Sequence, residues 1–214
     1  MLSKMVQRFN SSIPQTELLG MNQKPAGGAA LHTFPAHDAG DLIIMMTGQN
    51  DAYKDPCPDI SGWTVMGAVD NANSGATLAR QIKVFYKEDT DGTLTSITNS
   101  IQYITSFAIR SYDLSTISIG MTHDNTVTSA PKFDSFYPST DITAGGLVFG
   151  GFYGGAPTTG RNTGNSQNPF SVYNGGGAAY GYPDTWSGTA TRDYFLSSPS
   201  VQEVGYMVCI PNPA

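Results

Sequence analysis

The strongest hydrophobic pattern in the chain lies between residues 35 and 87. Five apolar residues follow one another without interruption in Leu42–Met46, with Gly40 and Gly48 on either side of the run. Such a short run is typical of a strand covered on both faces, because a helix would need ten or more residues. We therefore expect a buried strand here. Asp41 precedes it, and its carboxylate is expected to accept backbone N–H groups of the preceding turn.

Two more strands are predicted within the same stretch. An apolar segment begins at Trp63, directly after Gly62, and indicates a strand over residues 63–69. The indole of Trp63 is large enough to cover the core between two sheets, and we expect it there. Residues 82–87 alternate with a period of two, which predicts a half-buried strand. One face carries Ile82, Val84 and Tyr86, and the other carries Lys83, Phe85 and Lys87.

The rest of the chain shows no sustained helical period, so an all-β protein is expected. Residues 1–12 lack a core pattern and are interpreted as an N-terminal arm. Residues 13–214 are interpreted as a single antiparallel β-sandwich, jelly-roll-like, in which the Gly- and aromatic-rich stretch 154–188 is a long surface loop. Turn residues at 70–75 and 88–92 predict hairpins. Further strands are expected at 13–19, 29–34, 77–87, 102–110, 114–121, 191–196 and 204–210, and connecting loops at 48–61 and 126–139.

These strands resemble those of a known group of proteins. A Gly-Asp-Leu entrance to an apolar strand, a later Gly-Trp-Thr segment and an aromatic-Lys strand are similar to phage virion structural proteins of β-sandwich or jelly-roll type. Such proteins decorate or cement capsids or form parts of tails and fibres. The resemblance covers residues 13–120, and it implies a fold and a structural role without any catalytic residue. The matching residues are Asp41, Leu42, Gly62, Trp63, Tyr86 and Lys87.

The composition suits a β-protein whose surface is partly covered by neighbours. Only 13% of the 214 residues are charged, whereas about a quarter is usual. The 24 glycines and 13 prolines favour short strands joined by tight turns. The net charge of −6 repels phosphate, so no nucleic-acid partner is expected. We see neither a run of the ~18 apolar residues that a membrane span needs nor a secretory leader, and we expect assembly in the cytoplasm and a place in the virion.

Two acidic segments invite a metal-site interpretation. Asp89-Thr90-Asp91-Gly92 resembles the start of a calcium loop, but the twelfth position is Ser100, which is not acidic. A β-turn with solvated carboxylates is expected there instead. Asp51, Asp55 and Asp59 share one predicted loop, where prolines exclude a helical arrangement. No metal site is predicted at either place.

Other reactive side chains also lack an arrangement typical of catalysis. The three histidines, His32, His37 and His123, do not have the spacing of zinc ligands. No Gly-x-Ser-x-Gly motif is present, and no catalytic residue and no cofactor is predicted. Cys57 and Cys209 are expected to be free thiols.

Partner binding is the one function for which the sequence offers candidate residues. Aromatic residues of 149–186 can stack on sugar rings or on a neighbouring protein, or can simply plug the edge of the sheet. The apolar positions of the arm are expected to lie on a neighbouring chain. We expect a non-enzymatic capsid decoration or cement subunit that forms homo-oligomers and contacts other virion proteins. The alternative is a carbohydrate-binding or adhesion module of a tail fibre or cell-surface protein. The candidate partner-binding residues are Met1, Leu2, Met5, Phe9, Phe152, Tyr153, Tyr173, Tyr180, Tyr182 and Trp186.

Overall fold

A computed structural model describes residues 15–24, 30–51, 57–70, 79–99, 103–124, 146–154, 171–173, 176–181 and 203–213. The regular structure in these segments is β-strand, apart from a 3-10 turn, η1, at Leu114–Thr116. None of the described segments forms an α-helix. All strand pairings found are antiparallel. The expectation of an all-β protein built from antiparallel sheets is therefore confirmed.

The strands follow one another along the whole described chain. They are β1 (Glu17–Lys24), β2 (Ala30–Thr33), β3 (Leu42–Asp51), β4 (Thr64–Asp70), β5 (Ala79–Glu88), β6 (Ser96–Asn99), β7 (Tyr103–Arg110), β8 (Ser118–Asp124), β9 (Leu147–Gly154), β10 (Ser171–Tyr173), β11 (Gly176–Gly181) and β12 (Glu203–Ile210).

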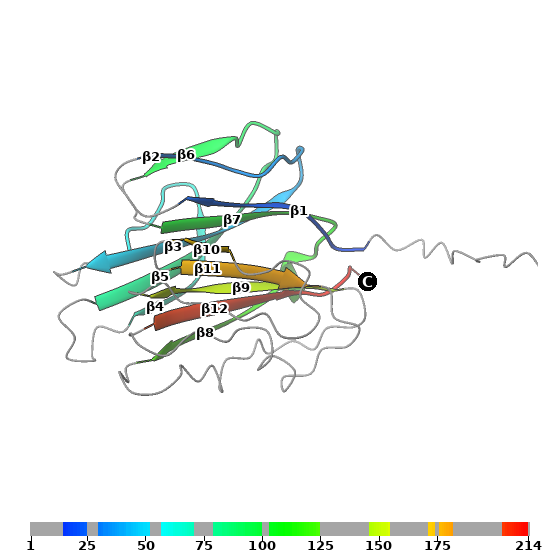
Figure 1. The fold of residues 1–214 in the computed structure, drawn as a ribbon. Coiled ribbons are helices and arrows are strands. Elements are labelled where there is room, and N and C mark those ends of the chain that lie inside the picture. The colour runs from blue at the N-terminus through cyan, green and yellow to red at the C-terminus, as the bar shows by residue number, and fades with distance from the viewer. Residues whose placement is uncertain are drawn as a thin grey trace, which may run out of the picture.

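The strands form two five-stranded sheets and one two-stranded ribbon (Figure 1). Sheet 1 has the strand order β1-β7-β3-β5-β4, and sheet 2 has the order β10-β11-β9-β12-β8. The ribbon consists of β2 paired with β6. The described strands fill the two sheets one after the other, since those of sheet 1 run up to β7 and those of sheet 2 begin at β8.

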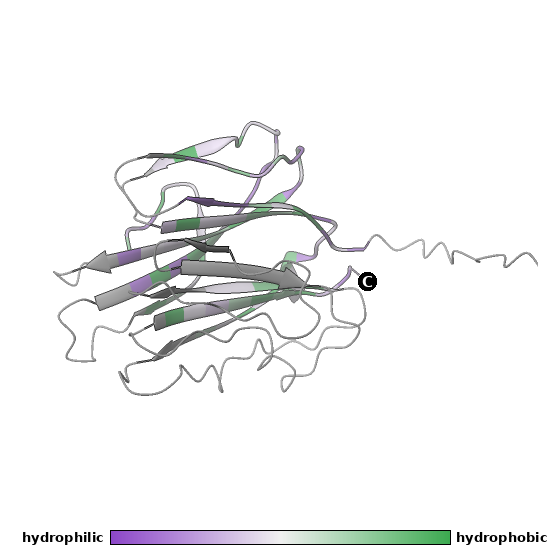
Figure 2. Cartoon of the chain, viewed as in Figure 1, coloured by the Kyte–Doolittle hydropathy of each residue, from purple (hydrophilic) through white to green (hydrophobic). Residues whose placement is uncertain are grey.

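Strand β3 lies at the centre of sheet 1 and pairs with β5 on one side and β7 on the other. The side chains of Leu42–Met46 alternate between two hydrophobic clusters, and all five are fully buried. The predicted strand covered on both faces is thus confirmed. Its far end is hydrophilic (the purple patch near the β3 arrowhead in Figure 2) and continues to Asp51. The loop predicted from residue 48 therefore begins too early, because pairing on both sides extends the strand beyond its apolar run.

The larger hydrophobic cluster fills the space between sheet 1 and sheet 2. Phe107 of β7 stacks on Phe149 of β9, with ring centroids 4.1 Å apart. From β12, Tyr206 and Val208 join Ile44 of β3 in the same cluster, and all three are fully buried. Both sheets thus contribute buried side chains to one shared core.

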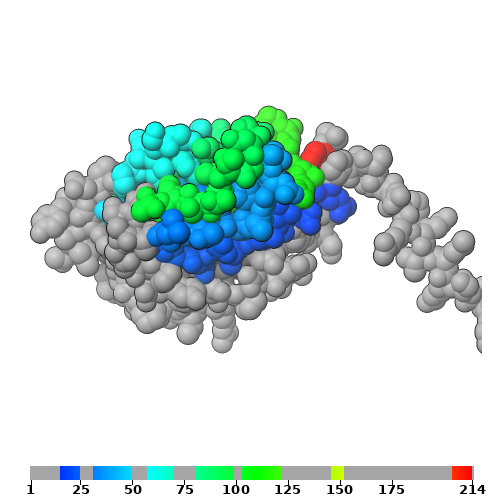
Figure 3. All heavy atoms as spheres, turned by 90° about the horizontal axis from the view of Figure 1, so that it is seen from above, coloured from blue at the N-terminus to red at the C-terminus, as the bar shows by residue number. Residues whose placement is uncertain are grey.

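A smaller cluster covers the opposite face of sheet 1, beneath the β2–β6 ribbon. The described residues at the surface seen from this side belong mostly to the first half of the chain (blue to green in Figure 3). A buried polar contact also joins the ribbon to sheet 1, because Nε2 of His32 lies 2.8 Å from Oγ of Ser106. The buried members of the cluster are Phe34, Ile43, Met45, Phe85, Ile104 and Ala108, with Leu19, Ile60, Trp63, Leu94 and Ile97 packed at its margin.

Two predictions for β5 have different outcomes. The alternation of residues 82–87 is confirmed, but Phe85 is fully buried in the smaller cluster, so the strand is covered on both faces and not on one. The antiparallel pairing of β4 with β5 agrees with the hairpin predicted at 70–75, whose turn lies outside the described residues. The hairpin predicted at 88–92 is wrong, because the strand that follows, β6, pairs with β2.

The second half of the chain differs from expectation in two places. The stretch 154–188 was predicted to be a surface loop, but it contains β10 and β11, and β11 pairs with β9 in sheet 2. The strand predicted at 114–121 begins later, at Ser118, because the side chain of Asp113 accepts the N–H of Ser115 and starts the η1 turn. The closing strand at 204–210 is confirmed as part of β12. The predicted strand 191–196 and the loop 126–139 lie outside the described residues.

Thr16 joins the two ends of the described chain. Its N–H donates to Oδ1 of Asn212 at 2.9 Å, and its hydroxyl lies 3.0 Å from the carbonyl oxygen of Pro211 and 2.9 Å from that of Ser111. Ser111 follows β7, and Pro211 follows β12. One buried threonine therefore ties the start of β1 to the ends of strands in both sheets.

Candidate functional site

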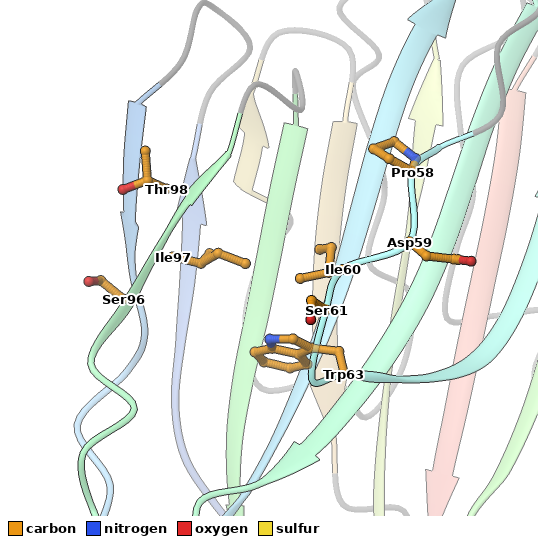
Figure 4. Close-up of a pocket in the computed structure, with 8 residues that line it drawn as sticks. All are labelled: Pro58, Asp59, Ile60, Ser61, Trp63, Ser96, Ile97 and Thr98. Atoms are coloured by element: carbon orange, nitrogen blue, oxygen red, sulfur yellow. The ribbon is translucent and has the colours of Figure 1, made fainter.

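A groove opens between the segment 58–63 and strand β6, on the ribbon side of sheet 1 (Figure 4). Its volume is about 580 Å³, within the range of about 300–1,000 Å³ found for small-molecule sites. We call it the Trp63 groove. Its lining residues are Pro58, Asp59, Ile60, Ser61, Trp63, Ser96, Ile97 and Thr98.

One hydrogen-bonded contact to sheet 1 and one turn within the loop hold the loop wall of this groove in place. The backbone N–H of Cys57 donates to Oε1 of Gln81 at 2.6 Å, and its thiol lies 3.6 Å from the carbonyl oxygen of the same residue. At the other end, the N–H of Trp63 donates to the carbonyl oxygen of Ile60 at 3.1 Å. The turn passes through Gly62 with a φ of 77°, a conformation that costs glycine little. The loop is thus attached to β5 at its start and closed by a turn at its end.

The Trp63 side chain lies on the outer side of sheet 1. Its indole ring packs against Phe34, with centroids 5.5 Å apart, at the margin of the smaller cluster. It is partly exposed and lines the groove. The expectation that Trp63 covers the core between two sheets is therefore wrong, because the ribbon provides a second covering layer that the local pattern does not reveal.

Asp59 and Lys83 form an ion pair at the rim of the groove. Nζ of Lys83 lies 2.8 Å from Oδ1 of Asp59, and the Asp59 side chain is 79% exposed. Asp51 and Asp55 were expected in the same loop as Asp59. Asp51 instead ends β3, and Asp55 lies outside the described residues. Within the described part of the chain, no three His, Cys, Asp or Glu residues are placed to hold a metal ion.

A second polar cluster lies at the entrance of β3. Arg110 donates from Nε to Oδ1 of Asp41 at 2.8 Å and from Nη2 to Oδ2 at 2.6 Å, a bidentate geometry that binds carboxylates well. The same Nη2 lies 2.6 Å from Oδ2 of Asp38. The N–H of Asp38 donates to Oδ2 of Asp41 at 2.7 Å, which confirms the expected turn contact. The cluster therefore closes the turn that leads into the central strand.

The electrostatics of this cluster favour charged side chains. Burial alone would raise the pKa of Asp41, but the hydrogen bonds from Arg110 and from the Asp38 backbone outweigh it, and the pKa is lowered. The hydrogen bonds to Asp41 and Asp38 raise the pKa of Arg110 above its already high value. Arg110 and Asp41 are thus held as a guanidinium and a carboxylate, so neither of these two is available as a free acid or base.

Asp89 differs from expectation because it is buried. Nε2 of His37 lies 2.9 Å from its Oδ2, and the backbone N–H groups of Gly92 and Leu94 donate to its two oxygens. Burial alone would raise its pKa, but these hydrogen bonds, the one from Leu94 first, lower it. The prediction of solvated carboxylates holds for exposed Asp91 and is wrong for Asp89. Asp89 organises a turn instead of meeting solvent.

The His32–Ser106 pair has the residue types of a nucleophile and its base. Burial first, and the nearby charge of Lys24 second, lower the pKa of His32 to about 4, so its ring is neutral at pH 7. Both side chains are buried between the ribbon and sheet 1, with His32 2% exposed and Ser106 0% exposed. A substrate therefore has no access to the hydroxyl, and the pair pins the ribbon to the sheet.

The candidate partner-binding residues fall into two groups. Four of them lie in strands of sheet 2, where Phe152 and Tyr153 belong to β9, Tyr173 to β10 and Tyr180 to β11. The pairing register places both Tyr153 and Tyr173 opposite Gly176, so the two tyrosines lie in one row across the sheet. The remaining candidates, Met1, Leu2, Met5, Phe9, Tyr182 and Trp186, lie outside the described residues.

Comparisons with protein-family models, with curated proteins and with solved structures find no match. Among the described residues, no helix is long and apolar enough to cross a membrane. The two cysteines are both buried and free, as predicted.

Sequence reasoning missed one wall of the groove. Residues Ser96–Thr98 follow a predicted turn and show only one apolar position, so they give no signal of a strand that faces the segment 58–63. Nothing local indicates that β6 pairs with β2, which lies more than 60 residues earlier. The one available signal is Trp63 itself, a large aromatic residue next to a turn glycine and a polar loop.

Proposed function

We propose that this chain is a non-enzymatic phage virion structural subunit whose fold is a β-sandwich. The sandwich is supported by the shared core of sheet 1 and sheet 2, to which β3, β7, β9 and β12 all contribute fully buried side chains. The sequential filling of the two sheets does not favour the jelly-roll connectivity, in which both sheets take strands from both halves of the chain. A solved structure of the full chain tests that finer feature.

The observation that carries the functional proposal is the position of the residues that resemble virion proteins. They come from three separate stretches, yet they meet at one end of sheet 1. In the register of the sheet, Leu42 lies opposite Glu88, next to Lys87, and Thr64, next to Trp63, lies opposite Tyr86. The resemblance therefore corresponds to one contiguous three-strand unit, β4-β5-β3, and not to scattered positions.

The mechanism proposed is the burial of surface between neighbouring subunits. A stable interface of standard size buries about 1,600 Å² in total. The low fraction of charged residues, 13%, reduces the repulsion between copies. Symmetric self-association of such subunits on a particle would bridge its neighbouring shell proteins. The contacts are proposed at the apolar residues of the arm, 1–12, and at the aromatic residues of sheet 2.

Deletion of residues 1–12 tests this proposal. The hydrogen bonds of Thr16 hold the start of β1 independently of the arm, so the truncated chain is expected to keep its melting temperature. Its self-association, measured by sedimentation velocity, and its co-sedimentation with phage particles are expected to weaken. A full-length chain that stays monomeric at every concentration and binds no particle would refute the structural role. Equal binding by the truncated and the full-length chain would indicate that the contact lies on sheet 2 and not on the arm.

The alternative function, a carbohydrate-binding or adhesion module, is favoured by one observation. The Trp63 groove combines a partly exposed indole with polar side chains and has the volume of a ligand site. Binding to a glycan array without co-sedimentation with particles would support this alternative over the structural role.

A further inference from the structure

The Trp63 groove offers an apolar floor between two polar walls. Ile60 from the loop and Ile97 from β6 point toward each other, and the Trp63 indole lies beside them (Figure 4). All three side chains pack at the margin of the smaller cluster and are only partly buried. The floor is therefore anchored in the core and still faces the groove.

The β6 wall presents backbone hydrogen-bonding groups. The N–H of Phe34 donates to the carbonyl oxygen of Thr95 at 2.9 Å, in line with the ribbon register that pairs His32 with Ile97. Backbone groups in an antiparallel pair alternate between the partner strand and the free side. Ile97 therefore directs its N–H and C=O toward β2, whereas Ser96 and Thr98, which line the groove, direct theirs away from β2.

The loop wall presents side-chain groups. The exposed carboxylate of Asp59 is held at the rim by Lys83 and points away from Ile97 (Figure 4). The exposed hydroxyl of Ser61 lines the same wall. The indole nitrogen of Trp63 lies on the edge of the ring nearer to β6, where it adds one donor (Figure 4).

We propose that the Trp63 groove binds a pyranose ring of a neutral glycan. One face of a pyranose consists of C–H groups that pack on an aromatic ring, and its edges carry hydroxyls that both donate and accept hydrogen bonds. The groove supplies an indole, the Ser61 hydroxyl, and the backbone groups of Ser96 and Thr98 that point away from β2. A neutral sugar also meets no repulsion from a chain with a net charge of −6. The site does not depend on the virion assignment.

An extended peptide added to β6 is the competing occupant. Strand addition takes its affinity from a row of main-chain hydrogen bonds. β6 has only four residues, and only Ser96 and Thr98 among the groove-lining residues face the free side. This edge is short for a peptide, whereas a single ring needs only a few such groups.

The test uses tryptophan fluorescence of the full chain. The chain has two tryptophans, so Trp186→Phe leaves Trp63 as the only indole. The probes are the methyl pyranosides of glucose, galactose, mannose and N-acetylglucosamine, followed by a glycan array. We expect at least one to shift the Trp63 emission saturably. Failure of every pyranoside and every array glycan would overturn the proposal.

Variants locate the binding in the groove. In the chain that retains Trp186, Trp63→Ala is expected to weaken binding, followed by calorimetry or on the array, by at least about tenfold. Val65→Ala, which removes an exposed apolar side chain of β4 away from the groove lining, is the matched control and should bind as the parent does. If Trp63→Ala does not fold, Ser61→Ala replaces it, because that side chain is exposed and lines the groove. Unchanged affinity in the folded groove variant would refute the site.

One further variant tests the β6 wall. Thr98→Pro removes an N–H of a groove-lining residue that points away from β2, and edge strands tolerate proline at such a position. Loss of sugar binding with an unchanged circular dichroism spectrum is expected. Selection of an extended peptide from a displayed library, with binding lost in Thr98→Pro and no sugar bound, would overturn the proposal in favour of strand addition.

Discussion

The two faces of sheet 1 are covered in different ways. The inner face meets sheet 2, and the buried members of the cluster between them are at most 1% exposed. The outer face meets the two-stranded ribbon and the segment 58–63, where several cluster members are only partly buried and a groove remains open. The inner face therefore supplies a sealed core. On the outer face, some side chains that pack against the core also remain accessible to solvent, and functional residues are expected there.

The largest effect is expected from a change in the inner core. Phe107 is fully buried and stacks on Phe149 across the two sheets. Phe107→Ala removes this contact and leaves a cavity, so we expect a loss of about 3–5 kcal/mol in the free energy of unfolding. Urea denaturation followed by circular dichroism measures it. A loss below about 1 kcal/mol would show that the two sheets do not share a tightly packed core.

Acidification is expected to weaken the outer covering selectively. The folded pKa of His32 is about 4, against an ordinary value of about 6.5. Unfolded chains therefore take up the proton first, and stability is lost as the pH falls from about 6.5 toward 4, by about 3 kcal/mol in total. The pKa values of Asp41 and Asp89 are lowered, so these carboxylates titrate below this window.

The measurement is the urea midpoint at pH 7 and pH 5. The parent chain should lose stability over this interval, whereas His32→Gln should show a flatter profile, whatever its stability at pH 7. If the parent chain is equally stable at both pH values, the pKa of His32 is not lowered in the folded state, and its ring contacts solvent.

Neighbouring residues of β3 allow a direct comparison of the two faces. Ile44 enters the inner cluster and Ile43 the outer one, and both are fully buried. The ribbon can settle into a cavity more easily than sheet 2 can, so Ile44→Ala should cost about 1 kcal/mol more than Ile43→Ala. Chemical denaturation of both variants under one condition measures the difference. A larger cost for Ile43→Ala would mean that the outer face is the more rigid of the two.

Most of the central architecture was readable from the sequence, and the outer covering was not. The uninterrupted apolar run from Leu42 correctly predicted a strand buried on both faces, and Asp41 accepts the turn N–H as expected. The sequence did not reveal what covers each face. That depends on the pairing of β2 with β6, which joins residues far apart in the chain.

The candidate site was missed for the same physical reason. Trp63 has the local pattern of a core residue, and only the position of the ribbon decides which side of sheet 1 it joins. The polar end of β3 and the glycine-rich β11 were likewise predicted as loops. Both are strands because they pair with long neighbours, and backbone pairing overrides a weak local preference.

The smallest effect is expected from thiol chemistry. Burial is the main reason that the pKa of the Cys57 thiol is raised to about 11, and burial also raises the pKa of Cys209. Both thiols are therefore protonated and shielded at pH 8, and neither should react with Ellman's reagent until the chain unfolds. Reducing agents should leave the melting temperature unchanged. Rapid labelling of Cys57 in the native protein would show that the loop wall of the groove opens.

The sequential filling of the two sheets has a consequence for synthesis on the ribosome. All described strands of sheet 1 and of the ribbon lie before residue 111, so they can pair before sheet 2 has been made. At about 5–20 residues per second, the remaining chain takes roughly 5–20 s to emerge. During this interval the hydrophobic surface around Leu42, Ile44 and Phe107 has no cover from its own chain. The nascent protein therefore passes through a stage in which chaperones compete with aggregation for that surface.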